Sequence, residues 1–357
     1  MFDESNSGTK EIAEQHRFDP ARLERFLAKN LPGFSGPVSV RQFKGGQSNP
    51  TYQLTTPTRA YVMRAKPGPA GTLLPSAHAI EREFRVLTAL HGSDVPVAEP
   101  LLLCDDEDII GRAFYIMEMV EGRVLWDPAM PGVSRDERAM LYDEMNRVMA
   151  TLHTVDIAAR GLSDYGKPGN YFARQIDRWT RQYRSAEMES IEAMDQLIAW
   201  LPKNMPADDG LSSIVHGDYR VDNLIFGSQG PKVLAVLDWE LSTLGHPLAD
   251  FSYHCMAWNA PREFRGLAGQ DLAALGIPNE REYVEKYCRR TGFDITGNWN
   301  FYLAFNMFRL AGINQGVAKR ALDGIASSDL ARQVGNTTRP LAEMAWSYAE
   351  KVEKNIG

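Results

Sequence analysis

The sequence predicts an α+β fold with two lobes: a small lobe with an antiparallel sheet plus one helix, and a larger, mostly helical lobe that carries a β-hairpin. Three observations predict this. Apolar and polar residues alternate from Val38 to Met63, which is typical of half-buried strands. Two short apolar runs, 224–226 and 233–237, flank a polar turn and indicate a hairpin. From Pro261 onward the pattern is helical.

Composition narrows the functional classes. At 357 residues, with 24% charged and 44% hydrophobic residues, the chain can bury a core in each of two lobes. The net charge of −7 argues against binding nucleic acid or an anionic membrane. Cys104, Cys255 and Cys288 lie far apart, which indicates no zinc site and no disulfide framework. The sequence has a polar, acidic N-terminus and no apolar run near the ~18 residues of a membrane span. We therefore expect a cytoplasmic protein with no membrane partner; the oligomeric state is not indicated.

The small lobe is expected over residues 18–120, after a flexible arm at residues 1–17. Its first helix begins with Asp19 as N-cap and Pro20 in the first turn. Strands then flank the segment K-G-G-Q-S-N. Here Gly45 and Gly46 would let the backbone fold closely over a ligand. Ser48 and Asn49 would offer polar groups to phosphate oxygens, together with the intervening glutamine. The alternative is a plain hairpin turn.

The next strand, Y-V-M-R-A-K, carries two basic residues, either of which could bind phosphates. If Y-V-M-R stands where V-A-I-K stands in protein kinases, the cation is Arg64. Lys66 would share its face, but a proline follows at once, so Arg64 is favoured. The carboxylate that holds this cation should lie on the helix expected over 78–90. Both Glu81 and Glu83 are candidates, and the pattern leaves the choice open.

The hairpin carries the residues with the clearest chemistry. Asp218 opens the loop, Asn223 follows after four intervening residues, and Asp238 ends the second strand. Kinase catalytic loops have the same order and spacing. Asp238 and Asn223 offer the hard oxygen ligands that Mg²⁺ prefers. Asp218 would orient an acceptor hydroxyl and take its proton. We expect the three to converge at one end of a small sheet, with Glu240 as a further metal-site or turn carboxylate.

The block H-G-D-Y-R-V-D-N-L-I-F followed by L-D-W-E resembles the aminoglycoside phosphotransferase and choline kinase superfamily, which has a protein-kinase-like fold. The resemblance implies ATP and Mg²⁺, with the same roles for Asp218, Asn223 and Asp238. It places the adenine contacts at the Glu118 carbonyl and the Val120 N–H. It also places Glu83 at the superfamily's helix glutamate.

The wider context resembles one branch of that superfamily. The segments A-H-A-I-E-R-E-F-R-V-L, F-Y-I-M-E-M-V-E-G and F-R-L-A-G-I-N-Q-G are similar to the kinase-like domain associated with acyl-CoA dehydrogenases. This branch implies a hydroxylated acyl or carboxylic metabolite as acceptor. By the same resemblance, Asp250 is the buried carboxylate that braces the catalytic loop through backbone N–H groups.

The large lobe is expected over residues 121–357. Ser134 and Glu137 form a capping box at the start of its first helix. His153 is interpreted as a structural hydrogen-bonding residue. Two helices are expected between Tyr171 and Trp200, and they wall the acceptor site in superfamily members. Basic residues outnumber acidic ones from Trp299 to Pro340, which would suit an acceptor bearing carboxylate or phosphate.

The sequence thus predicts a small-molecule kinase that uses ATP and Mg²⁺ and transfers the γ-phosphoryl group to a hydroxyl. A nucleotide-binding pseudokinase or regulatory module is one alternative, since an arginine replaces the strand lysine. An aminoglycoside phosphotransferase is the other. The choice between ATP and GTP stays open. The short interval from Asp238 to Asp250 leaves no room for a protein-kinase activation segment and argues against a protein substrate.

Overall fold

The computed structural model describes residues 7–45, 49–67, 79–167, 169–295, 297–322 and 334–354. The chain forms two compact units. The first unit comprises residues 1–148, 158–162 and 220–242, and the second comprises 149–157, 163–219 and 243–357. The segment H-G-D-Y-R-V-D-N-L-I-F is therefore divided between the units, because the boundary between them falls between Tyr219 and Arg220.

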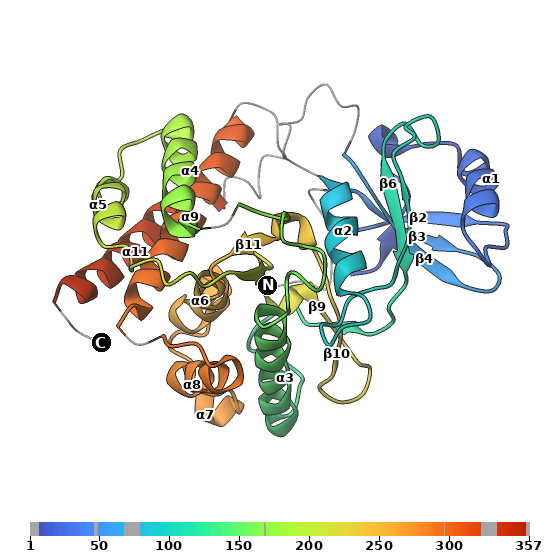
Figure 1. Ribbon diagram of the computed structural model, residues 1–357. Coiled ribbons are helices and arrows are strands. Elements are labelled where there is room, and N and C mark those ends of the chain that lie inside the picture. Colours follow the sequence, from blue (N-terminus) through green and yellow to red (C-terminus); the bar gives the residue numbers. More distant parts are fainter. Residues whose placement is uncertain are drawn as a thin grey trace. The chain divides into compact units, whose positions relative to one another are not determined.

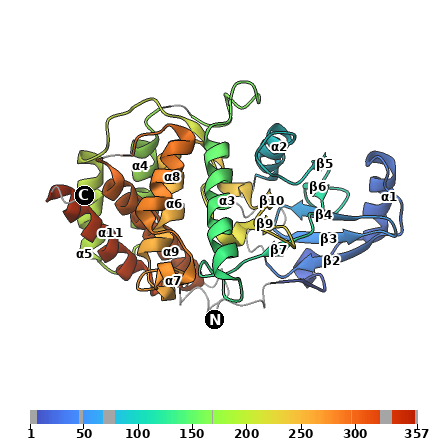
Figure 2. The ribbon, with the colours of Figure 1, turned by 90° about the horizontal axis from the view of Figure 1, so that it is seen from below.

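The first unit is built on a six-stranded sheet in the order β1-β2-β3-β4-β6-β5 (Figure 2). Every neighbouring pair in it is antiparallel. The strands are β1 (Thr9–Lys10), β2 (Ser39–Phe43), β3 (Thr51–Thr55), β4 (Ala60–Ala65), β5 (Pro100–Cys104) and β6 (Phe114–Glu118). β3 and β4 pair Tyr52 with Met63, which fixes the face on which each β4 side chain lies.

Two helices, α1 (Pro20–Asn30) and α2 (Ile80–Leu90), cover opposite faces of this sheet (Figure 1). Asp19 caps α1 by accepting a hydrogen bond from Ala21 N–H. On the α1 face, Tyr61 and Met63 enter a core with the apolar residues of that helix. Because strand side chains alternate, Arg64 faces the opposite way, towards α2.

A smaller sheet of the first unit has the order β10-β9-β7 and contains both strands of the predicted hairpin. Its strands are β7 (Arg123–Val124), β9 (Leu224–Phe226) and β10 (Val233–Val236). The antiparallel pairing of β9 with β10 confirms the predicted hairpin. Short 3-10 helices adjoin both strands, η5 (Val221–Asn223) before β9 and η6 (Trp239–Leu241) after β10.

The second unit is mostly helical. Its helices α4 and α5 lie where two helices were predicted, and α11 packs along α9 (Figures 1 and 2). The helices are α4 (Tyr171–Ala186), α5 (Glu192–Trp200), α6 (Pro247–Asn259), α7 (Leu272–Leu275), α8 (Glu280–Thr291), α9 (Trp299–Leu322) and α11 (Thr338–Glu353). Helix α3 (Arg135–His153) begins in the first unit and ends in the second. Within the described ranges, further 3-10 helices are η2 (Glu14–His16), η4 (Leu201–Lys203) and η7 (Arg262–Phe264).

One pairing in the second unit was not predicted. The apolar run before His216 forms β8 (Ser213–Val215), and it pairs antiparallel with β11 (Thr243–Gly245). Gly245 is required there, because a Cβ atom would lie 2.6 Å from the Tyr171 ring. Asp218 thus follows a strand in the second unit, whereas Asn223 and Asp238 flank strands in the first.

The antiparallel sheet and the helical second unit confirm the predicted α+β class. The limits of the arm and lobes at residues 17 and 120 stay predictions. No helix in the described ranges combines the length and the apolar character that crossing a bilayer requires.

Candidate functional site

The end of the hairpin brings two predicted metal ligands together. Leu237 N–H donates a hydrogen bond to the Asn223 carbonyl at 2.8 Å, so Asn223 and Asp238 occupy the same end of the β9–β10 pair. Asp238 has φ 64° and ψ 65°, which places a non-glycine residue in the left-handed region. Such a conformation is sparsely populated and is often retained at functional sites. The turn therefore presents the Asp238 carboxylate at the cost of local backbone strain.

Arg64 is buried at the centre of a charge cluster in the first unit. Its Nε is 2.8 Å from Glu83 Oε2, and its Nη2 is 2.5 Å from Asp238 Oδ1 and 3.5 Å from Glu240 Oε2. Burial disfavours the charge of Arg64, yet the carboxylates, Glu83 foremost, outweigh burial and raise its pKa. One guanidinium thus joins strand β4, helix α2 and the turn after β10.

Glu83 is held on two further sides. Asn49 Nδ2 donates to Glu83 Oε1 at 2.8 Å, and the Tyr115 hydroxyl donates to Oε2 at 3.1 Å. The Glu83 side chain is only 2% exposed, and burial raises its pKa against the opposing effect of Arg64. Burial likewise raises the pKa of Tyr115 well above its usual value. These contacts fix the carboxylate that orients Arg64.

The alternative cation and carboxylate form a separate pair. Lys66 Nζ contacts Glu81 Oε1, and their side chains are 30% and 41% exposed. The Arg64–Glu83 pair is 10% and 2% exposed. Both pairings satisfy the sequence pattern, but only Arg64 reaches Asp238 among the described contacts. Its role towards phosphates remains a prediction.

The glycine-rich segment is described only at its ends. Gly46 and Ser48 lie outside the described residues, as does the glutamine between them. Gly45 is half-buried and follows β2. Asn49 is fully buried, with its Nδ2 on Glu83 and with no hydrogen-bond partner for its Oδ1 among the described residues. Its observed contact is therefore with the ion-pair carboxylate, and phosphate binding by this segment stays a prediction.

The predicted adenine contacts lie at the end of β6. Glu118 is the last residue of that strand, and its Oε1 accepts a hydrogen bond from Glu99 N–H at 3.1 Å. Val120 follows, half-buried and outside regular structure. The Glu118 side chain thus stabilises the segment, while its main chain is the part assigned to adenine.

In the second unit, the loop that carries Asp218 is braced from α6. Asp250 accepts hydrogen bonds from His216 N–H at 2.6 Å and Gly217 N–H at 2.8 Å. His153 Nε2 lies 3.2 Å from the same carboxylate, and its Nδ1 lies 2.6 Å from the Tyr287 hydroxyl. Burial opposes the charge of Asp250, but the His153 hydrogen bond and the adjacent donors lower its pKa. The bracing expected of Asp250 and the structural role expected of His153 are both present.

Two residues contact this loop that the sequence analysis did not assign to it. The Tyr253 hydroxyl donates to Asp218 Oδ1 at 2.6 Å, and Arg309 Nη2 donates to the Gly217 carbonyl at 2.7 Å. Tyr253 lies three residues after Asp250 on α6, so the two share a helix face. That spacing could have indicated Tyr253. Arg309 is one of the basic residues counted between Trp299 and Pro340, and its sequence context indicates no role at this loop.

Comparison with known proteins identifies the family of this chain. The model of the phosphotransferase enzyme family (APH) matches residues 39–286, which include β2 to β6, the hairpin and α6. The chain belongs to the phosphotransferase enzyme family. The fold is accordingly the kinase-like fold of that family, as the sequence predicted.

Three similar proteins show how far the resemblance extends. Mouse acyl-CoA dehydrogenase family member 10 is 50% identical over 92% of this chain, which spans 31% of that protein. A crystal structure from Ralstonia eutropha JMP134, provisionally named an aminoglycoside phosphotransferase, is 61% identical with a TM-score of 0.86; the match covers 94% of this chain and 99% of that one. Aminoglycoside phosphotransferase APH(4)-Ia, in a ternary complex with ADP and hygromycin B, is 15% identical with a TM-score of 0.59; the match covers 91% of this chain and 98% of that one.

The mouse relatives named acyl-CoA dehydrogenase family members 10 and 11, which are 50% and 44% identical to this chain, fit the branch inferred from the sequence. The chain spans less than half the length of the curated relatives that it matches most strongly. Their longer chains hold further regions, so their activities as whole proteins are not transferred to this phosphotransferase. The likeness to APH(4)-Ia shows the fold alone.

The donor set of the first unit fits Mg²⁺. The Asp238 and Glu240 carboxylates lie near one Arg64 nitrogen, and Asn223 lies at the same hairpin end. Within the described ranges, no three His, Cys, Asp or Glu side chains form a metal-binding cluster. Mg²⁺ bound with nucleotide needs only one or two protein carboxylates besides phosphate oxygens. The residues therefore suit a metal that arrives with a triphosphate.

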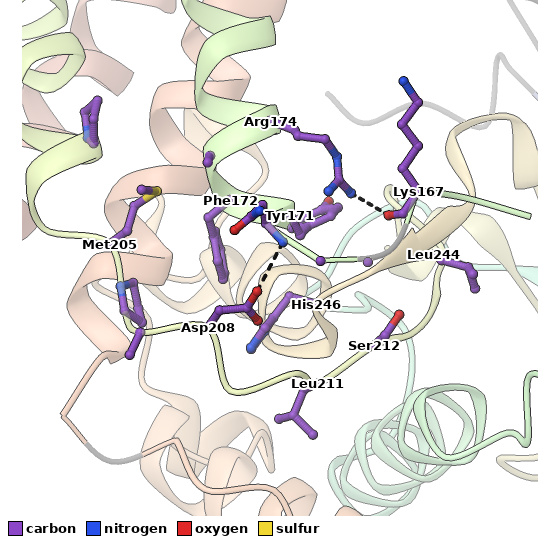
Figure 3. Close-up of a pocket in the computed structure, with 17 residues that line it drawn as sticks. Lys167, Tyr171, Phe172, Arg174, Met205, Asp208, Leu211, Ser212, Leu244 and His246 are labelled. Atoms are coloured by element: carbon purple, nitrogen blue, oxygen red, sulfur yellow. Dashed lines mark hydrogen bonds between the residues drawn. The ribbon is translucent and has the colours of Figure 1, made fainter. Parts of the chain in front are cut away.

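A pocket of about 240 Å³ lies in the second unit at the N-terminal end of α4 (Figure 3). Lys167 and Arg174 line it, and Arg174 Nη2 donates to the Lys167 carbonyl at 2.7 Å. Backbone N–H groups, that of Gly210 foremost, lower the pKa of Asp208 at its rim. Burial lowers the pKa of His246, another lining residue. None of the predicted site residues lines this pocket.

Proposed function

We propose that this phosphotransferase moves the γ-phosphoryl group of ATP, with Mg²⁺, to a hydroxyl of a small molecule. The observation that carries the proposal is the first-unit cluster, in which Arg64 joins Glu83 to the Asp238 carboxylate beside Asn223. Phosphoryl transfer depends on positioning and charge neutralisation more than on covalent chemistry, and this cluster, with Mg²⁺ bound, would supply both.

Each residue has a defined task under this proposal. Arg64 would bind the phosphates, with Glu83 fixing its direction, and a guanidinium suits phosphate because it can bind two oxygens at once. Asp238 and Asn223 would hold Mg²⁺, which neutralises the triphosphate when bound. Asp218 would orient the acceptor hydroxyl and take its proton as the new O–P bond forms and the bond to the leaving ADP breaks. The Glu118 carbonyl and Val120 N–H would bind adenine.

We infer that the acceptor is a hydroxylated acyl or related carboxylic metabolite. Mouse acyl-CoA dehydrogenase family member 10 supports this class, because its name describes an acyl-CoA enzyme and it is 50% identical to this chain. The excess of basic over acidic residues from Trp299 to Pro340 would also suit a carboxylate or phosphate. An aminoglycoside is the second candidate, favoured by the name of the Ralstonia relative at 61% identity.

A coupled assay of ADP release tests these alternatives. Mg-ATP is supplied with a panel of hydroxyacyl-CoAs, choline, homoserine and aminoglycosides, for the wild type and for Asp218→Asn. Turnover of a hydroxyacyl-CoA that disappears in the variant is the expected result. Turnover of aminoglycosides alone would select the second candidate. Binding of Mg-ATP without turnover of any acceptor would favour a nucleotide-binding module, and equal turnover by the variant would exclude the proposed role of Asp218.

A further inference from the structure

A tyrosine hydroxyl is bonded directly to the carboxylate assigned to the acceptor. Tyr253 on α6 donates to Asp218 Oδ1 at 2.6 Å, a short hydrogen bond to an acidic group. The backbone of the same loop is fixed independently, since Asp250, one turn earlier on α6, accepts from His216 and Gly217. Helix α6 thus holds both the main chain before Asp218 and the Asp218 side chain itself.

Arg309 on α9 fixes the tyrosine and the loop together. Its guanidinium lies 5.1 Å from the Tyr253 ring centre and 5.7 Å from that of Trp179 on α4. Its Nη2 donates to the Gly217 carbonyl at 2.7 Å. Arg309 is only 8% exposed, so this cation is buried against aromatic faces and a main-chain acceptor. Burying arginine is costly unless its donors are used, which indicates a specific task.

We propose that Tyr253 and Arg309 are positioning residues for the Asp218 carboxylate. This inference rests on the proposed function and goes beyond it by naming what orients the acceptor-binding group. A carboxylate rotates about its Cβ–Cγ bond, and a donor fixed on Oδ1 restricts that rotation. The carboxylate then meets the acceptor hydroxyl in one orientation, which affects the rate of transfer more than the binding of nucleotide.

The first test compares Tyr253→Phe with Tyr348→Phe. Tyr348 is a matched control, because its hydroxyl donates to Asn259 Oδ1, also at 2.6 Å and also partly buried, in the same unit. ADP release from Mg-ATP is measured with water as the only acceptor and then with a 3-hydroxyacyl-CoA. Tyr253→Phe should lower kcat roughly 10- to 100-fold and leave the KM for ATP within about two-fold, the loss expected for one hydrogen bond to a charged group. Tyr348→Phe should match the wild type.

A double-mutant cycle separates positioning from general stability. If Tyr253 acts through Asp218, its replacement should have no further effect in an Asp218→Ala background. Arg309→Lys should retain more activity than Arg309→Met, because lysine can still donate to the Gly217 carbonyl. Amide hydrogen exchange of the peptide that contains Gly217 and Asp218 should rise in Arg309→Met and stay unchanged in Tyr348→Phe, with no acceptor present.

The outcomes distinguish this inference from the proposed function. If the wild type turns over and Asp218→Asn does not, but Tyr253→Phe has wild-type kcat, the function stands and the positioning role is overturned. The positioning role is also overturned if Tyr253→Phe loses equal activity with or without Asp218. If the wild type transfers no phosphoryl group to water or to any acceptor, the proposed function fails, and the two residues only stabilise the loop. Unchanged exchange in Arg309→Met overturns its part whatever the activity.

Discussion

The buried ion pair of Arg64 yields the sharpest energetic prediction. Replacing Arg64 with Met leaves Glu83, with a side chain 2% exposed, and Asp238 without their shared cation. Removing one partner of a buried pair costs about 3–5 kcal/mol of unfolding free energy, because the remaining charge stays desolvated. Arg64→Lys keeps the charge but has one nitrogen in place of the Nε and Nη2 that contact the two carboxylates. It should lose about 1.5–3 kcal/mol, the value of one hydrogen bond to a charged group.

Urea denaturation of the three proteins measures these losses, with Lys66→Met as the control. Lys66 follows the same strand, and its pair with Glu81 is 30% and 41% exposed. An exposed pair contributes about 0–1 kcal/mol, so Lys66→Met should change the unfolding free energy by no more than that. Calorimetric titration should also show that Arg64→Met loses Mg-ATP affinity while Lys66→Met retains it. Equal losses for Arg64→Met and Lys66→Met would refute the assignment of Arg64 as the central cation.

Two further predictions concern the second unit. Burial lowers the pKa of His254 to about 4, so as the pH falls the unfolded chain binds a proton at this residue before the folded chain does. The stability that His254 contributes above about pH 6.5 is therefore lost as the pH drops towards 4. Between about pH 7.5 and pH 5 this residue should account for a loss of about 2 kcal/mol, absent in His254→Gln, and identical pH slopes in urea denaturation would disprove it. Asp250→Asn leaves only one carbonyl oxygen to accept from the N–H groups of His216 and Gly217. This variant should lower the free energy of unfolding by about 1.5–3 kcal/mol and should lower kcat at least about ten-fold. A variant with wild-type kcat would show that this brace does not serve turnover.

Local sequence patterns predicted the helices and strands, but they did not predict every contact between these elements. The N-cap Asp19, the hairpin of β9 and β10 and the two helices α4 and α5 follow from residue order alone, because caps, turns and periodicity act over a few residues. The pairing of β8 with β11 joins short strands that are distant in the sequence, too short for a recognisable pattern.

Choices that depend on packing could not be made from the sequence. Because strand side chains alternate, Arg64 and Lys66 lie on the same face of the chain at β4. The packing of α2 against this face buries Arg64 with Glu83. The same packing leaves Lys66 near the surface, where it pairs with Glu81. The left-handed backbone of Asp238 likewise depends on the turn into η6. Tyr253 had a usable signal in its spacing from Asp250, whereas the contact of Arg309 with Gly217 joins residues 92 positions apart.

Transfer of the γ-phosphoryl group itself tests the proposed kinase activity most directly. Mg-ATP radiolabelled at the γ-phosphate is incubated with the hydroxyacyl-CoA panel, and the products of the wild type and Asp218→Asn are separated. We expect a labelled phosphate ester of a small molecule from the wild type and none from the variant, while both bind Mg-ATP. Equal labelling by Asp218→Asn, or label that reaches the protein and no small molecule, would contradict the proposed activity.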